Sequence, residues 1–280
     1  MTRTLNARFA AYETSAEPFR IGLAPLDPAH FIVSDEEDAE ALAEKRRLVA
    51  TGCDAVFQAR TDSAHEQAEA AELVANNLRR YHGREIAIAD RPLLDASLKV
   101  QEDLLVMRRE ANGDWRLVAG SLCFPSSWNL HEKFDRPLTA IHAPVPRLEE
   151  RMGARIRRMF DMMRPERPMW RQNWSIHGDG ERRHVRSASE RHDWDSAGSG
   201  EPFLRLEYQT LWKLPLSNSI LFTVRIFSRP FARLRDTKTG RALAEVLSRQ
   251  LGELADDEAD YKGLAARRGE LTQRLREVAR

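Results

Sequence analysis

The chain has 280 residues, and its 44 lysines and arginines nearly balance 43 aspartates and glutamates, for a net charge of +1. That balance disfavours a nucleic-acid-binding protein driven by bulk positive charge, and no apolar run approaches the roughly 20 residues of a membrane-spanning helix. Its two cysteines, Cys53 and Cys123, form no Cys-x-x-Cys pair, and the N-terminus lacks the apolar stretch of a secretory signal. The sequence therefore predicts a cytoplasmic protein with reduced thiols and with neither nucleic acid nor membrane as a partner.

The N-terminal part of the sequence predicts an arm followed by two helices. Residues 1–33 carry scattered proline and glycine without a clear period and are expected to extend over the surface. Ser34 and Glu37 have the spacing of a capping box, which predicts a helix from there to about residue 50. The same signal predicts a second helix over residues 63–83. Both helices are interpreted as scaffold.

From about residue 100 the pattern changes to strands. Asn112-Gly113 is a strong hairpin-turn signal between two apolar runs. The run 147–163 has apolar residues at helical spacing, and its methionines are typical of a core but would equally suit an apolar pocket. The predicted strands are 103–109, 115–124, 169–177, 203–214 and 220–228, with a mobile loop at 178–200.

Together these elements predict an α+β fold, with an antiparallel sheet of about five strands and flanking helices. The predicted organisation is an N-terminal arm (1–33), a central domain that includes the N-terminal helices (34–235) and a charged C-terminal helical extension (236–280). Whether that extension is a docking face or plain scaffold stays open.

One histidine has an unusual setting. The sequence lacks the glycine-rich nucleotide loops, the zinc-protease motif and the nucleophile elbow, so those enzyme classes are disfavoured. His142 stands in an apolar stretch, and prolines at 144 and 146 stiffen the chain after it, as suits a metal or haem ligand of fixed direction. The alternative, which position alone favours, is a hydrogen-bonded core histidine. His131 and His177 are weaker candidates, because their spacing to His142 fits no zinc signature.

Charged residues recur on the last three predicted strands. Arginines on a sheet face are usually solvated or ion-paired, but beside a pocket they would bind the carboxylates of an anionic cofactor. Carboxylates such as Glu132 and Glu207 would bind an ammonium group or serve as partners of those arginines. The candidate cations are Arg171, Arg205 and Arg225.

A set of ordered motifs resembles a known family over about residues 25–235. The chain is similar there to the haem-dependent oxidative N-demethylases. The motifs are Gln101-Glu-Asp, Cys123-Phe-Pro-Ser-Ser-Trp, Glu132-Lys, Ile141-His-Ala-Pro-Val-Pro, Arg171-Gln-Asn-Trp, Arg205-Leu-Glu-Tyr-Gln-Thr-Leu-Trp-Lys-Leu-Pro and Ile220-Leu-Phe-Thr-Val-Arg-Ile-Phe-Ser-Arg-Pro.

The resemblance implies a PAS-like, haem-binding domain within residues 34–235. It also implies an oxygen-dependent monooxygenase that removes a methyl group from a small secondary amine such as dimethylamine and releases formaldehyde. Haem b would be bound through its iron by His142, with Arg171, Arg205 and Arg225 as further cofactor contacts and Glu207 binding the substrate ammonium. The electrons would come from NADPH through a separate flavin and iron–sulfur reductase, since no motif for those cofactors is visible here.

Two other interpretations stay open. One is a haem- or small-ligand-binding sensor module that turns nothing over, which would need the same axial ligand. The other is a structural or assembly protein without a cofactor, in which His142 belongs to the core and the arginines are ion-paired. Oxygen consumption with an amine separates the first from an enzyme, and a colourless protein would indicate the second.

Overall fold

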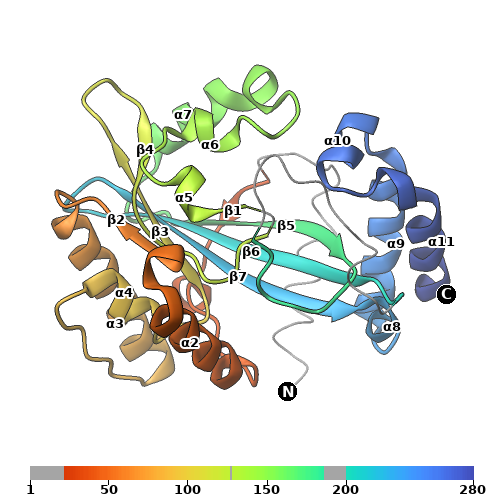
Figure 1. Ribbon diagram of the computed structural model, residues 1–280, viewed down its shortest axis with the longest axis horizontal. Helices are drawn as coiled ribbons and strands as arrows, with labels where there is room; N and C mark the ends of the chain where they lie inside the picture. Colours follow the sequence, from red (N-terminus) through yellow and green to blue (C-terminus); the bar gives the residue numbers. More distant parts are fainter. Residues whose placement is uncertain (1–21, 127, 186–199) are drawn as a thin grey trace.

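A single antiparallel sheet forms the centre of the molecule (Figure 1). The computed structural model describes residues 22–126, 128–185 and 200–280, so residues 1–21 of the predicted arm and 186–199 of the predicted mobile loop lie outside the described residues. The strands are β1 (Ala24–Pro25), β2 (Phe57–Ala59), β3 (Asp103–Arg109), β4 (Trp115–Ser121), β5 (Met169–His177), β6 (Phe203–Lys213) and β7 (Ile220–Pro230). They are neighbours in the order β1-β5-β6-β7-β3-β4-β2.

Three groups of helices flank this sheet, and the picture shows them at three separate places around it (Figure 1). Before β3 come η1 (Pro28–His30), α2 (Asp38–Val56), α3 (Ala64–His82) and α4 (Pro92–Ser97). Between β4 and β5 come α5 (Leu130–Lys133), α6 (Leu138–His142), the π-helical turn η2 (Glu149–Gly153) and α7 (Ala154–Met162). After β7 come α8 (Phe231–Leu234), α9 (Lys238–Glu253), α10 (Asp256–Tyr261), η4 (Ala265–Arg267) and α11 (Arg268–Ala279). None of the helices in the described ranges has both the length and the apolarity to cross a membrane.

The predicted α+β class and the antiparallel sheet are confirmed, but the strand count is seven instead of about five. The five predicted strands correspond to β3 through β7. The missed strands, β1 and β2, have only two and three residues, too few for side-chain alternation to reveal them. Strand β4 also stops at Ser121, earlier than predicted, because the amides of Cys123 and Phe124 each donate to the Asp103 carboxylate at 2.8 Å instead of to a neighbouring strand.

The capping box predicted at Ser34 does not form. Helix α2 begins only at Asp38, without a side-chain cap, because the Asp35 carboxylate accepts a hydrogen bond from the Glu37 amide and also pairs with Arg225. Gly52, with φ of −175° and ψ of 71°, interrupts the helix close to the predicted end at about residue 50, and a further turn then runs to Val56. Thus Asp35 both accepts a hydrogen bond just before the helix and pairs with a distant arginine on the sheet.

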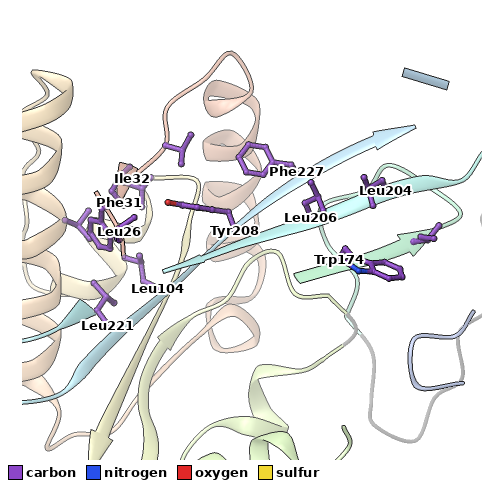
Figure 2. Close-up of a cluster of buried hydrophobic side chains, with 14 of the residues drawn as sticks. Leu26, Phe31, Ile32, Leu104, Trp174, Leu204, Leu206, Tyr208, Leu221 and Phe227 are labelled. Atoms are coloured by element: carbon purple, nitrogen blue, oxygen red, sulfur yellow. The ribbon is translucent and has the colours of Figure 1, made fainter. Parts of the chain in front are cut away.

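The two faces of the sheet bury different clusters. On one face, Leu204, Leu206 and Tyr208 of β6 lie with Trp174 and Phe227 in the larger apolar core (Figure 2). Helices α3, α4, α9 and α11 contribute to the same cluster. On the other face a second cluster contains Leu105, Leu211 and Ile226 from the strands, and it includes residues of α5, α6 and α7. Side chains alternate along a strand, so β3, β4, β6 and β7 each contribute to both clusters.

Both predicted extensions share the larger core. Residues 31–33, at the end of the predicted arm, are almost completely buried. Leu243 and Leu247 of α9 and Leu271 and Leu275 of α11 are fully buried against the same cluster. The described parts of the arm and of the C-terminal extension therefore help to enclose the sheet.

A buried ionic network joins the N-terminal segments to the sheet. The fully buried Arg225 of β7 pairs with Asp35 at 2.6 Å and with Asp38 at 3.3 Å, and it donates to the Val33 carbonyl at 2.7 Å. Beside it, Glu102 accepts from the Val33 amide at 2.8 Å, while Lys45 of α2 lies 3.4 Å from Asp103. Burial raises the pKa of both Glu102 and Asp103, and the neighbouring Arg225 and Lys45 oppose that shift.

Arg225→Met is expected to lower the free energy of unfolding by about 3–5 kcal/mol, because it leaves buried carboxylates without their cation. Arg233→Met is the matched control: Arg233 is 74% exposed and, among the described residues, has Asp236 as its one ion-pair partner, so its loss should cost less than about 1 kcal/mol. Urea unfolding of both variants beside the wild type measures the difference. Equal, small effects would contradict a stabilising role for the network.

Candidate functional site

Strand register brings four polar side chains to the sheet face that α6 and α7 cover. Arg171 of β5 pairs with Gln209 of β6, and Asn173 pairs with Glu207. Glu207 in turn pairs with Ile226 on β7, and Ile226 belongs to the cluster that includes Leu138 of α6 and Phe160 of α7. Because directly paired residues point to the same face, Arg171, Asn173, Glu207 and Gln209 lie on that face as well.

Hydrogen bonds hold the Glu207 carboxylate in place. Gln209 donates from Nε2 to Glu207 Oε2 at 2.6 Å, and Asn173 donates from Nδ2 to the same oxygen at 3.3 Å. The side chain is 9% exposed. An acceptor fixed in this way at a sheet face can take a hydrogen bond from a ligand ammonium or N–H group.

His142 is the last residue of α6. Burial is the main reason that its pKa is lowered to about 4, and the positive charges of Arg171 and Lys133 act in the same direction. Lys133 also donates to the Ile141 carbonyl at 2.9 Å, which ties α5 to the end of α6. The imidazole is therefore neutral at physiological pH, the form that binds a metal ion.

Lys262, directly after α10, reaches the edge of β5. Its Nζ donates to the Trp174 carbonyl at 2.6 Å and lies 4.5 Å from the centre of the Trp174 ring. Burial lowers its pKa to about 8; the Glu207 charge opposes this shift, and the Arg171 charge adds to it. The C-terminal extension thus adds a cation to the charged group formed by Arg171 and Glu207.

An ion pair links the two sides of this site. Arg147, in the segment that follows His142, lies 2.6 Å from Asp257 of α10. The backbone of Arg147 has a φ of 54°, in the left-handed region, which non-glycine residues adopt only when the surrounding structure holds them there. The pair brings the segment after α6 next to α10, the helix directly before Lys262.

The structure separates the three predicted arginines. Only Arg171 lies with His142 and Glu207. Arg205 is on the same face but donates to the carbonyls of Phe124, Pro125, Glu181 and Arg182 and to the hydroxyl of Ser126; burial lowers its pKa to about 10, so it stays charged at neutral pH. Arg225 pairs in register with Tyr208 and lies on the opposite face, in the ionic network.

The other candidates lie apart from this group. His131 of α5 is exposed and contacts Gln58. His177 is buried; its Nε2 lies 2.8 Å from Ser175 Oγ, and its ring stacks on His184 with centroids 4.1 Å apart. Among the described residues, no three His, Cys, Asp or Glu side chains form a metal-binding group.

The donor set suits a haem better than a bare metal ion. Haem needs one protein ligand, such as a neutral histidine, together with apolar surroundings. Beside α6, the predicted methionine run supplies Phe160 and Met163 as buried residues and Ile156 and Met159 as half-buried ones. A cation such as Arg171 near the ligand matches the propionates of the group. The residues present therefore fit haem.

Two contributors were missed by the sequence analysis. Gln209 belongs to a quoted motif and lies two positions after Glu207 on the same face of β6, yet only the structure shows that its Nε2 donates to Glu207 Oε2. Lys262 lies beyond residue 235, in a segment whose only sequence signal was charged helical spacing. No local pattern could have placed it at the edge of β5.

A model of the family described as haem-dependent oxidative N-demethylase, alpha subunit-like, matches residues 80–271. The chain belongs to this family. The resemblance in the sequence is thereby confirmed, and the matched range also covers α9, α10 and Lys262. The name of the N-demethylase family indicates dependence on haem, and its designation as an alpha-subunit family implies a partner subunit.

Lys262→Met is expected to change how stability depends on pH. The pKa of Lys262 is about 8 in the folded chain and about 10.4 in an unfolded one. Between these values the unfolded state binds more protons, so the free energy of unfolding rises with pH and the folded state is favoured. The wild type should gain stability relative to Lys262→Met from pH 8 to 10.

Denaturant unfolding at several pH values provides the measurement. Lys238→Met, at an exposed lysine of α9, is the control, and its difference from the wild type should not change with pH. A pH-independent difference for Lys262→Met would contradict a buried, pKa-lowered ammonium at this position.

Proposed function

We propose that the chain is the haem-binding subunit of an oxidative N-demethylase that acts on a small secondary amine such as dimethylamine. The observation that carries this proposal is the placement of a neutral imidazole, His142, with Arg171 and Glu207 over one sheet face. These groups would supply an iron ligand, a cation for a haem propionate and an anion for a substrate ammonium. The family of the chain supports the same assignment.

The strand order supports the PAS-like part of the proposal. Counted from β3, the five long strands lie in the order 2-1-5-4-3. Helices α5, α6 and α7 all lie between the second and third of them. A PAS-like domain is built in this way, with its first strand central in a five-stranded antiparallel sheet and its helices inserted after the second strand. Such a domain holds its ligand between those helices and the sheet.

In the proposed site, His142 would hold the iron of haem b through a ring nitrogen. Its neutral state leaves the electron pair available, and Lys133 holds the end of α6 through the Ile141 carbonyl. Arg171 is assigned to a propionate. Haem, when bound, supplies the oxygen-activating chemistry. The earlier assignment of Arg205 and Arg225 to the cofactor stays a prediction, and the proposal makes no use of it, because both side chains already bind other parts of the chain.

Glu207 binds the protonated amine. Its oxygen atoms accept N–H groups of the ammonium, and Gln209 and Asn173 hold the carboxylate so that the methyl group has a fixed direction. The apolar residues of α6 and α7 limit the access of water. In the overall reaction one oxygen atom ends in formaldehyde and the other in water, which requires two electrons and two protons besides the amine and O2.

The electrons are assigned to NADPH, delivered through a separate flavin and iron–sulfur reductase. A partner subunit, which the family's name implies, fits that arrangement. A reducing, cytoplasmic setting is also part of the proposal, and the two unbridged thiols support it: Cys53 is half-buried, and burial raises the pKa of Cys123 to about 12.

His142→Ala is expected to abolish or shift the Soret band of protein purified from haem-replete cells. The reason is the loss of the only iron ligand in the proposed site. His131→Ala, at an exposed histidine one helix away, should keep the wild-type spectrum. Visible absorption spectra of the oxidised and reduced forms make the comparison. A wild type that stays colourless with added haemin, or an unchanged His142→Ala spectrum, would remove the haem assignment.

Glu207→Gln should lower kcat/KM for dimethylamine at least about tenfold, since a charge-assisted hydrogen bond to the ammonium is replaced by a neutral one. The haem spectrum should stay as in the wild type. Glu132→Gln, which changes the other carboxylate considered for the ammonium, is the matched control. Oxygen uptake and formaldehyde release with a competent reductase are measured. An intact Soret band without amine turnover in the wild type would favour the ligand-sensing alternative.

A further inference from the structure

The outer face of α7 presents arginines to solvent. Arg155 and Arg158 are separated by three positions and Met162 follows four positions later, so all three point to the same side of the helix. Both arginines are exposed, and Met162 is 71% exposed. The inner side of the same helix carries Phe160, which is buried in the cluster beneath the helix.

Two further exposed arginines, Arg164 and Arg167, follow in the turn after α7. We call Arg155, Arg158, Met162, Arg164 and Arg167 the α7 patch. Within the described ranges, no carboxylate lies at ion-pair distance from any of its four arginines.

Of the acidic residues nearby, Asp161 and Glu149 have other partners, while the exposed Glu166 lies between Arg164 and Arg167 in the sequence, so the four arginines of the patch still exceed its negative charge. Asp161 lies 2.9 Å from Arg109 and accepts from the Trp115 indole at 3.0 Å. Glu149 pairs with Arg157, which lies on another side of the helix. The chain as a whole has a net charge of only +1, so the positive charge of the patch is a local feature. A surface of this kind attracts and orients an acidic partner.

We infer that the α7 patch docks an acidic iron–sulfur electron-transfer protein. The inference rests on the proposed function and extends it to the place where electrons enter. Electron-transfer complexes are small and rely on complementary charge, and Met162 offers an apolar contact among the arginines. An α-helix with its side chains is about 10–12 Å across, so α7 alone separates a partner on the patch from the residues of its inner side.

The position of α7 fits such a role. Phe160 belongs to the same buried cluster as Leu138 of α6, the helix that ends at His142. Each transfer would move one electron from the reduced iron–sulfur centre, which is oxidised, to the iron in the proposed site, which is reduced. Two such transfers, with two protons from solvent, supply the balance of the demethylation.

Binding to a plant-type [2Fe–2S] ferredoxin with an acidic surface tests the inference. Ferredoxin is passed over immobilised protein at low and high ionic strength, and the Kd is measured for the wild type and for Arg155→Glu/Arg158→Glu. The wild type should bind more weakly as salt increases, because salt screens exposed charges. The double variant should bind at least about tenfold more weakly at low salt.

A control with the same change in charge uses the C-terminal helices. Arg249→Glu/Arg276→Glu reverses two exposed arginines of α9 and α11, the other face considered for docking, and should keep the wild-type Kd within about twofold. Arg155→Gln/Arg158→Gln, which removes the charges without reversing them, should have an intermediate Kd. The rate at which NADPH-reduced ferredoxin reduces the haem should follow the same order, whereas reduction by dithionite should not change.

The outcomes separate the inference from the proposed function. A wild type that does not bind ferredoxin, or equal weakening by both charge-reversal pairs, would overturn the docking face. If the protein contains no haem but its variants still bind ferredoxin in the expected order of Kd values, the docking face is supported and the demethylase proposal is wrong. If the rate of haem reduction by ferredoxin is the same in the wild type and in the α7 variants, the haem assignment is retained and the docking face is removed.

Discussion

The architecture depends on the need to pair charges that lie out of reach of water. Arg225, Glu102, Asp103 and Lys45 are all fully buried, and an unpaired charge at any of these positions would cost several kcal/mol. Satisfying them requires the arm, α2 and the adjoining strands β3 and β7 to meet at one place. These charge pairs alone therefore fix the arm and α2 relative to β3 and β7, and the apolar contacts of the core add to that.

This constraint extends to the candidate site. The Asp103 carboxylate ends β4 by binding the amides of Cys123 and Phe124. Arg205 binds the carbonyls of Phe124 and Pro125 directly after that point. The chain that leads into α5 and α6 thus leaves the sheet from a position held on both sides, and α6 places His142. Arg205, which the sequence analysis assigned to the cofactor, holds the segment that leads into the helix of the proposed iron ligand.

Much of the fold could be predicted because its determinants are local. Alternation and the Asn112-Gly113 turn located the five long strands, and the proline-flanked setting of His142 singled out that residue. What could not be predicted depends on pairing between distant segments. Arg205 and Arg225 look alike in sequence, yet Arg205 pairs with Ser228, and Arg225 lies an odd number of residues from Ser228, so the two arginines point to opposite faces. Lys262 is far along the chain from the strand edge that it contacts, and the two-residue β1 forms only because β5 is there to pair with it.

The contact between Lys262 and β5 also matters during biosynthesis. Strand β1 pairs with β5 only at Met169 and Trp170, so near Trp174 the edge of β5 is covered by the lysine that follows α10. Ribosomes complete β5 and β6 well before they reach that lysine. A nascent or truncated chain that lacks it leaves the Trp174 carbonyl, at the edge of the described sheet, without this hydrogen-bond donor, and open edges pair with other chains. Completing translation through α10 thus protects the sheet from aggregation in addition to bringing Lys262 to the site.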